Sequence, residues 1–475
     1  MNYIKGVSRE QKILFPEVVD DFITEDNPVR FIDAFVDRLN LDELGFQKSQ
    51  LASTGRPPYH PGDLLKLYIY GYLNRVRSSR RLEKEAHRNI EVIWLLRKLR
   101  PDFKTIADFR KDSTKAFKQV FRQFILLCRK LDLFGGELIA IDGSKFKALN
   151  SKNRNFTKKK LKKRLEEIDA KIEKYLNELD AADEEEADVQ KPTAEELKEK
   201  IRQLRERKDR YGKLKEGMET SGESQVSLTD PDSRLMARDW QKVVGYNVQA
   251  AVDDKHKLIV EQDVTNAVTD DDQLSGIAIR AKETLGVDQM KVVADMGYYH
   301  GDEIKTCEKE GIEPYVSKPL TSANRKLGLY GKEKFTYDSG KDCYICPGGQ
   351  ELTYRFEITE LGRRIRYYAT STCRSCEKKP QCTRNKGGRR ITRWVHEHIL
   401  ERMQEGVEAN PELMKKRKQI VEHPFGTIKH WNDQGYFLMK GLKKVRAEMS
   451  LSTLAYNIKR SINILGVSRM IEALV

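Results

Sequence analysis

Two short apolar runs in this chain each end in an aspartate, LIAID at 138–142 and KVVAD at 291–295. Apolar runs of this length predict buried β-strands, so each carboxylate would stand at the end of a core strand. An ionised carboxylate in that place is costly to bury unless it is paired or coordinates a metal ion. Asp142 or Asp295 alone could simply cap the turn after its strand. Two of them in one sheet instead favour a divalent-cation site, because Mg²⁺ prefers oxygen ligands and two or three carboxylates suffice to hold it.

A third carboxylate for such a site is predicted at Glu422, in a basic stretch near the end of the chain. Because a residue that precedes proline is disfavoured from helical geometry, we expect a helix to start or kink at Pro424, with Glu422 near its mouth. Arg417, Lys418 and Lys429 surround this glutamate and would hold a phosphate backbone. Mg²⁺ ions held by such acids activate a water or a 3′-hydroxyl for in-line phosphoryl transfer.

The rest of the pattern predicts an α/β fold. We expect a β-hairpin over 245–264, a helix over 272–285, and a helix followed by a strand over 300–316. Together with the two aspartate-ended strands, these elements would form one mixed sheet with helices packed on it. The sequence therefore predicts a catalytic domain over 136–475, interrupted by two insertions.

The first insertion, at 155–220, is dominated by Lys, Glu, Asp and Arg. Apolar residues recur at spacings of four and three from Leu161 to Leu179, and a weaker repeat runs from Leu197 to Leu214, as in a heptad seam. Two such segments with a short break predict an antiparallel helical hairpin of the coiled-coil type. It could be a dimerisation or DNA-contacting arm, or a solvated spacer.

The second insertion, at 318–400, contains five of the seven cysteines: Cys343, Cys346, Cys373, Cys376 and Cys382. They form two CxxC pairs followed by a single cysteine, a spacing typical of a structural zinc site. Tetrahedral zinc needs four ligands, so we expect the two pairs to bind it, with Cys382 as a substitute or a spare. Free thiols or redox chemistry are the alternative.

Residues 1–135 are predicted to form a helical DNA-binding domain. Four arginines flank a Ser-Ser pair at a turn between two of its helices: Arg75, Arg77, Arg80 and Arg81. The chain carries a formal net charge of +15, which favours a polyanionic partner because Lys and Arg neutralise phosphates. The alternative is an ordinary helical bundle whose arginines face water, but the density of the cluster favours DNA contact.

No stretch of the sequence has the roughly 18 consecutive apolar residues that a membrane span needs. The N-terminus also lacks the charged-then-apolar form of a signal peptide. We therefore expect a cytoplasmic protein without a membrane partner.

Several longer motifs resemble a known family, and they cover nearly the whole chain. They are GRPPYHPGDLLKLYIYGYLNRVRSSRRLE (55–83), RNIEVIWLL (88–96), PDFKTIADFRKD (101–112), AIDGSKFKA (140–148), DPDSRLM (230–236), GYNVQAAVD (245–253), VVADMGYY (292–299) and VEHPFGTIK (421–429). In these motifs the chain resembles bacterial insertion-sequence transposases of the IS1182 group, which are related to the wider IS4-like DDE enzymes.

This resemblance implies a ribonuclease-H-like catalytic domain in which Asp142, Asp295 and Glu422 form the DDE triad and bind Mg²⁺ or Mn²⁺. Lys429 matches the lysine of the basic signature around the glutamate. The implied activity is metal-dependent DNA cleavage and strand transfer at the terminal inverted repeats of an insertion sequence. The implied setting is the bacterial nucleoid, with a homodimer in the synaptic complex.

Two other functions fit the same residues. A related nuclease would cut DNA without joining it, because cleavage and joining share one site. A DNA-binding protein that has lost catalysis would lack part of the triad, and the presence of all three acids counts against it.

Overall fold

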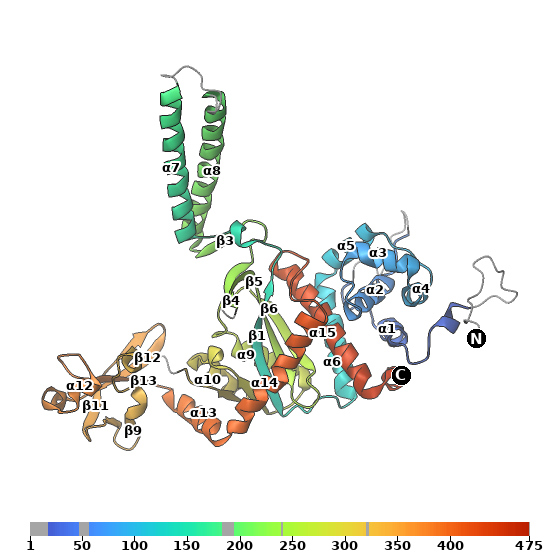
Figure 1. The fold of residues 1–475 in the computed structure, drawn as a ribbon. Helices are drawn as coiled ribbons and strands as arrows, with labels where there is room; N and C mark the ends of the chain where they lie inside the picture. Colours follow the sequence, from blue (N-terminus) through green and yellow to red (C-terminus); the bar gives the residue numbers. More distant parts are fainter. Residues whose placement is uncertain (1–17, 47–56, 183–193, 239–240, 320–322, 475) are drawn as a thin grey trace, which may run out of the picture.

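A computed structural model of the chain describes residues 18–46, 57–182, 194–238, 241–319 and 323–474. Its central body consists of one mixed sheet with helices packed on it (Figure 1). A long helical hairpin and a small second sheet project from this body in different directions. The N-terminal helices lie on the side of the body away from the second sheet.

The described N-terminal residues form a compact helical group, in agreement with the predicted helical pattern. Its helices are α1 (Pro28–Asp37), α2 (Pro61–Leu73), α3 (Ser79–Arg88), α4 (Ile90–Leu95), α5 (Phe103–Asp112) and α6 (Thr114–Lys130). α1 and α2 both begin with proline, whose missing N–H costs nothing at a first helical position. α2 is buried over nearly its whole length, because α1, α4, α5 and the C-terminal helices pack around it.

The predicted α/β class is confirmed by the central sheet. Its strands are β1 (Leu138–Lys147), β4 (Arg234–Arg238), β5 (Gln241–Asp253), β6 (Ile259–Thr265), β7 (Met290–Ala294) and β8 (Ile312–Val316). β1 pairs antiparallel with β5 on one side and parallel with β7 on the other, and β8 continues parallel beyond β7. β4 and β6 pair antiparallel with two different lengths of the other edge of β5.

Two helices connect the later strands of this sheet. α9 (Leu274–Leu285) lies between β6 and β7, and α10 (Gly301–Lys309) lies between β7 and β8. Parallel strands need such crossover connections, because a tight turn can join only antiparallel neighbours. Both helices, and the β5–β6 hairpin, agree with the sequence prediction.

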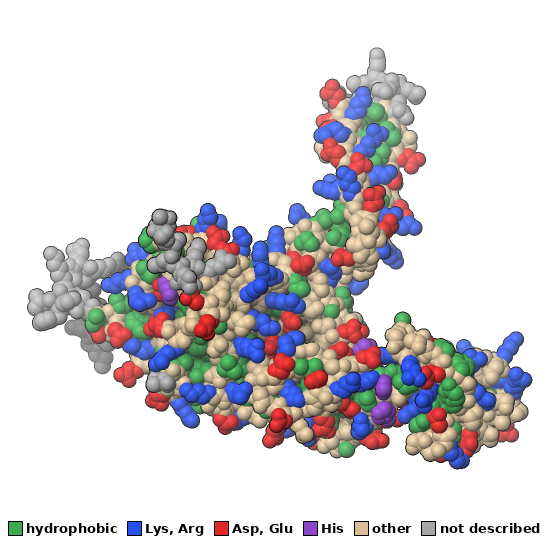
Figure 2. Space-filling model, turned by 180° about the vertical axis from the view of Figure 1, so that it is seen from behind, with side chains coloured by type: hydrophobic (Ala, Val, Ile, Leu, Met, Phe, Trp, Pro, Cys, Tyr) green, Lys and Arg blue, Asp and Glu red, His purple; other side chains and the backbone are tan. Residues whose placement is uncertain are grey.

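The first insertion is the antiparallel helical hairpin that the heptad pattern predicted. Its helices are α7 (Lys158–Ala182) and α8 (Ala194–Ser221), and at its base β2 (Asn155–Thr157) pairs with β3 (Gln225–Ser227). An ion pair of 2.6 Å between Lys208 Nζ and Asp169 Oδ1 joins the two facing helices. Acidic and basic side chains alternate along the projecting hairpin (Figure 2).

Shortening this hairpin is expected to leave the body folded. Because Asp169 and Lys208 face each other, a short Gly-Ser linker can replace residues 170–207 at that level. We expect the free energy of unfolding of the body to change by less than about 1 kcal/mol, since none of the described residues of the deleted part belongs to the main apolar core. Urea unfolding followed by tryptophan fluorescence measures this, and a loss of several kcal/mol would contradict it.

The second insertion forms a separate antiparallel sheet, which the sequence did not predict. Its strands follow the order β13-β12-β11-β10-β9 and are β9 (Thr336–Asp338), β10 (Cys343–Ile345), β11 (Glu351–Glu360), β12 (Arg363–Ala369) and β13 (Arg390–Trp394). The longest strand, β11, buries only Leu352. The apolar alternation that marks a strand is present in β11, at Leu352, Tyr354, Phe356 and Ile358, but three of these four side chains are exposed and the sequence prediction overlooked the pattern.

The C-terminal helices return to the body. They are α13 (Glu397–Ala409), α14 (Pro411–Gly426), the π-helical turn η6 (Thr427–Trp431), α15 (Leu442–Leu465) and α16 (Val467–Glu472). α15 is buried at most positions from Val445 to Ile458, because it packs between β6 on one side and α2 and α6 on the other.

Among the described residues, the structure contains no helix that is both long and apolar enough to cross a membrane.

Candidate active site

The two strand-borne aspartates meet at one level of the central sheet. β1 and β7 pair in parallel up to Ala140 and Val293, so Asp142 and Asp295 each follow the last pair by two residues. The charge of Asp295 raises the pKa of Asp142, which agrees with their proximity. Asp295 follows the last residue of β7 and caps the next turn, where its Oδ1 accepts a hydrogen bond of 2.8 Å from the Gly297 N–H. Two acids far apart in the sequence are therefore neighbours in the fold.

Asp142 does not end its strand, which corrects the sequence prediction. β1 continues to Lys147 because it pairs with β5 along almost its whole length, from Ile139 to Lys147. The strand that ends near Asp142 is its parallel neighbour β7, which stops at Ala294. The carboxylate thus lies in the interior of one strand, at the place where the neighbouring strand turns away.

The surroundings of Asp142 favour its protonated form. Burial raises the pKa of Asp142 to about 6, although Arg417 lowers it, and Asp295 and Asp270 raise it further. Arg417 Nη1 lies 3.7 Å from Asp142 Oδ2. The Gly143 N–H donates a hydrogen bond of 2.9 Å to Asp142 Oδ1 and also lowers the pKa. A nearby positive charge stabilises the ionised form of such a buried carboxyl more than that of an exposed aspartate.

Glu422 lies near the end of α14, and not at a helix mouth as predicted. α14 begins at Pro411 and runs through Pro424 to Gly426. A proline inside a helix removes one backbone hydrogen bond. Here the helix absorbs that loss and then widens into the π-helical turn η6, a local distortion that is frequent at functional sites. The Glu422 side chain is exposed.

Asp142 and Glu422 line the same open cleft, whose volume is about 370 Å³. β1 supplies one wall and the end of α14 with η6 the other. Lys429 lies in this cleft, where its Nζ donates a hydrogen bond to Ser144 Oγ and stands 4.7 Å from the centre of the Phe146 ring. A positive charge therefore stands on the wall opposite the β1 backbone.

The three predicted basic neighbours of Glu422 have different surroundings. Arg417 is largely buried beside Asp142, and Lys429 contacts β1 across the cleft. Lys418 is exposed on the outer face of α14. Only Arg417 and Lys429 are thus brought close to the predicted acids.

A further acid, Asp270, which was not predicted from the sequence, lies beside this cleft. It accepts hydrogen bonds of 2.5 Å from Asn247 Nδ2 and 2.7 Å from Gln249 Nε2, and pairs with Lys145 at 3.3 Å. A side chain at Gly143 would begin only 2.5 Å from Asp270 Oδ1, so the glycine after Asp142 is needed for this approach. The signal was a run of three aspartates before the helix at 274, which resembled an ordinary helix start.

Arg77 is not a DNA-contacting residue in this fold, which corrects the sequence prediction. It is only 6 % exposed and lies 3.4 Å from Glu448, which is fully buried. Its guanidinium also donates to the backbone carbonyls of Asp433 and Tyr436 at 2.8 and 2.9 Å. Arg77 therefore ties the N-terminal helices to the segment after η6, and its donors are used inside the protein.

The other arginines of that cluster, Arg75, Arg80 and Arg81, are exposed. The guanidinium of Arg80 stacks 5.1 Å from the centre of the Phe103 ring. On the face of the molecule that Figure 2 shows, basic side chains are spread over the body with acidic ones between them. DNA contact by these three arginines stays a prediction.

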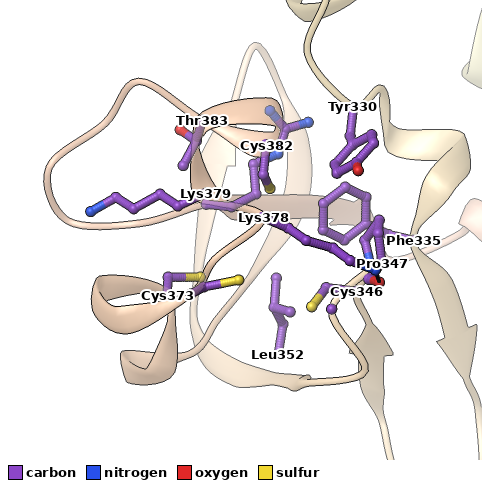
Figure 3. A pocket seen from close by; sticks show the side chains of 13 residues that line it. Tyr330, Phe335, Cys346, Pro347, Leu352, Cys373, Lys378, Lys379, Cys382 and Thr383 are labelled. Carbon is purple, nitrogen blue, oxygen red and sulfur yellow. Dashed lines mark hydrogen bonds between the residues drawn. The ribbon is translucent and has the colours of Figure 1, made fainter.

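Four of the five predicted zinc cysteines line one small cavity: Cys346, Cys373, Cys376 and Cys382 (Figure 3). Cys343 does not line it, because its position on β10 is turned into the sheet, where it is 1 % exposed. Burial raises the pKa of Cys382, with Arg389 acting in the opposite direction. The structure thus groups the four cysteines differently from the two CxxC pairs that we expected.

Over the described part of the chain, no three His, Cys, Asp or Glu side chains stand close enough together to hold a metal ion in their present positions. Neither the acids of the cleft nor the cysteines of the second sheet are close enough together among these described residues.

Comparison with known proteins yields two domain matches. Residues 17–112 match a family described as a transposase domain, DUF772, and residues 345–462 match a transposase DDE domain. The search of curated proteins yields no match. Among solved structures, a piggyBac transposase synaptic complex with hairpin DNA matches with 9 % identity and a TM-score of 0.25, over 92 % of this chain and 81 % of that one.

The two domain matches carry the family assignment. One covers most of the N-terminal helices, and the other includes α14 with Glu422 and most of α15. The DDE domain cleaves DNA and transfers strands, and divalent metal ions are typical of its family. The two domain matches therefore indicate a DNA transposase, an insertion-sequence transposase of the IS4 and IS1182 type.

Proposed function

We propose that Asp142, Asp295 and Glu422 are the acids at which this transposase binds divalent cations, cuts DNA and joins the cut ends to new DNA. The observation that carries the proposal is the parallel register of β1 and β7, which makes the two aspartates neighbours. Glu422 supports it from the facing helix, because it lines the same cleft as Asp142.

We also propose that the central sheet is ribonuclease-H-like. β6, β5 and β1 form an antiparallel meander, and β7 and β8 extend it with parallel strands. This arrangement supports the proposal, because it is the strand arrangement of ribonuclease-H-like folds. Such a sheet presents the first and fourth strands side by side, and these strands carry the two aspartates here.

Carboxylate oxygens are the ligands that Mg²⁺ and Mn²⁺ prefer, so the donors fit the proposed cations. The three acids must come closer together than they now stand to share an ion. Glu422 is exposed on the edge of the cleft, so its side chain has room to move. When bound, the cations would activate the attacking water or 3′-hydroxyl and stabilise the leaving oxygen.

The basic side chains would hold the DNA. Lys429 lines the cleft and Arg417 lies beside Asp142, so a phosphate next to Asp142 would meet both. Lys418 on α14 and the exposed Arg75, Arg80 and Arg81 on the N-terminal helices would contact the flanking backbone. Joining two ends of one element needs two active sites, so we include a synaptic homodimer in the proposal.

Divalent-ion mapping tests the metal site without relying on activity. Fe²⁺ replaces Mg²⁺, and ascorbate with peroxide then cuts the polypeptide beside the bound ion. We expect fragments that end near residues 142, 295 and 422, and we expect excess Mg²⁺ to suppress them. Cuts confined to other segments would overturn the assignment of these acids.

A DNA assay tests the reaction itself. A duplex carrying one end of the element with a free 3′-hydroxyl is incubated with a target duplex, in Mg²⁺ or in chelator. We expect joined products only in Mg²⁺. Cleavage without joining would identify a nuclease, and DNA binding with neither step would identify an inactive binding protein.

Metal binding should weaken in acid. Because the pKa of Asp142 is raised to about 6, the carboxyl is protonated below that pH and ionised above it. A proton competes with a cation for the same oxygen, so we expect the apparent Mn²⁺ affinity to fall by up to about tenfold for each pH unit below 6. Mn²⁺ titration followed by electron paramagnetic resonance measures this, and an affinity unchanged between pH 7.5 and 5 would contradict it.

A further inference from the structure

The second sheet has little apolar core of its own. Its buried cluster is separate from the main core and consists of Phe335, Tyr344, Leu352, Tyr368 and Ile391. Units with so small a core usually need disulfides or a metal ion to stay folded. All cysteines of this sheet are free thiols, so disulfides do not supply that support.

The segment between β12 and β13 needs such support most. Apart from Gly388, no residue from Ser371 to Arg390 is buried. Neither the short turn η5 (Ser371–Ser375) nor the short helix α12 (Lys379–Cys382) contributes a residue to the buried core. Cys382 alone of this segment packs against the buried cluster, so hydrophobic packing contributes little to holding the segment on the sheet, yet the segment carries three cysteines.

These three cysteines and one from the sheet surround a single small cavity. Cys373, Cys376 and Cys382 come from the segment, and Cys346 comes from the turn after β10 (Figure 3). The volume open to a water-sized atom is about 20 Å³, which is the room that one water molecule or one ion needs. A ligand of many atoms would not fit.

Two glycines let the backbone approach the sulfur atoms closely. A side chain at Gly348 would begin 3.6 Å from Cys346 Sγ and 3.5 Å from Cys376 Sγ, so these two sulfurs face one point. A side chain at Gly388, whose φ is +97°, would begin 2.6 Å from Cys373 Cβ and collide with it. Backbone at Gly348 and at Gly388 therefore packs directly against the cysteines on two sides of the cavity.

A backbone donor also points at one sulfur. The Gln350 N–H lies 3.4 Å from Cys346 Sγ, within the turn closed by Gly349 N–H and Cys346 C=O. Hydrogen bonds to the ligand atoms are a regular feature of metal sites, because they orient the ligands.

We propose that Cys346, Cys373, Cys376 and Cys382 bind one structural Zn²⁺ ion that fastens the segment between β12 and β13 to the second sheet. Four thiolates complete a tetrahedral zinc shell and leave no open position, so the ion holds the fold and takes no part in DNA chemistry. The sulfurs must draw together to bind it. Three of them lie on a segment without buried side chains, which offers little resistance to that movement.

The proposal excludes Cys343, although it belongs to a CxxC pair. Cys343 is buried on the β10 strand, where it pairs with Asp338 on one side and Thr353 on the other. It does not line the cavity. The cavity as it stands has room for about one ion, which favours zinc over an iron–sulfur cluster of several atoms.

Metal analysis of matched variants tests this choice of ligands. The full chain is purified from zinc-supplemented medium and its metal content is measured by mass spectrometry. We expect about one zinc per chain in the unaltered protein and in Cys343→Ala, and at least a fivefold loss in Cys382→Ser. No zinc in the unaltered protein would overturn the proposal, as would loss in Cys343→Ala with retention in Cys382→Ser.

Because a serine variant can fail to fold, a second experiment uses the unaltered protein. Brief alkylation with and without a chelator, followed by peptide mapping, identifies the protected thiols. We expect the chelator to expose Cys346, Cys373, Cys376 and Cys382 together, and to leave Cys343 unchanged. Equal labelling with and without chelator, or exposure of Cys343 in place of Cys382, would overturn the assignment. Neither result depends on the transposase activity.

Discussion

Replacing Asp142 by asparagine is expected to lower the rates of DNA cleavage and strand transfer by at least about 10³-fold, or about 4 kcal/mol of transition-state stabilisation. Asparagine keeps the size of the side chain but loses the negative charge that the proposed cation site requires. Because Asp142 lies inside β1 and pairs along β5 through its backbone, we expect the variant to stay folded. A gel assay of both steps in Mg²⁺ measures the loss.

A matched control is Asp288→Asn, at the opposite end of β7 from Asp295. Asp288 is exposed in the turn before that strand, so its charge lies away from the cleft. We expect its activity to stay within about twofold of the unaltered protein, since surface changes away from a site have small effects. Equal activity in Asp142→Asn and the unaltered chain would remove Asp142 from the active site.

The second large effect concerns stability. Arg77→Ala is expected to lower the free energy of unfolding by about 3 kcal/mol, because it leaves Glu448 as a buried carboxylate without its closest cation. Glu448 still accepts hydrogen bonds of 3.0 Å from the Leu438 and Met439 N–H groups. These bonds keep the cost at the lower end of the range for a broken buried pair. Urea unfolding of the full chain measures the change.

The pH dependence of this loss has a defined sign. Burial raises the pKa of Glu448 in the folded protein, although Arg110 and Arg77 lower it. The folded state therefore binds a proton more tightly than the unfolded chain does, and stability falls as the pH rises through the folded pKa. In Arg77→Ala the carboxylate has lost a cation, so we expect the destabilisation to shrink as the pH is lowered from 7.5 to 5.

An exposed neighbour serves as the control for Arg77. Arg81 lies on the surface of α3, and Arg81→Ala is expected to change stability by no more than about 0.5 kcal/mol. For DNA affinity we expect the opposite order, with Arg81→Ala weakening binding more than Arg77→Ala, because only the exposed Arg81 can reach a phosphate directly. A stability loss of similar size in both variants would contradict the buried role of Arg77.

The sequence by itself determined the elements whose pattern is local. Apolar runs marked β1 and β7, heptad spacing marked the hairpin of α7 and α8, and these patterns depend only on neighbours along the chain. The acids Asp142 and Asp295 could be chosen in the same way, because each follows such a run. The two domain matches then bear out the family that the motifs resembled.

The tertiary structure decided what depends on partners distant in the sequence. The pairing of β1 with β5 carries that strand beyond Asp142, and packing between β6 and α6 buries most of α15 after its basic start. Arg77 and Arg81 look alike in the sequence. In the fold, Arg77 is buried and paired with Glu448 of α15, whereas Arg81 is exposed to solvent. Cys382, and not Cys343 as expected from the CxxC pairs, lines the cavity with the other three cysteines. Cys343 is buried on β10, while α12 brings Cys382 to the cavity. Spacing along the chain specifies which residues are available, and only packing in three dimensions selects which of them share a site.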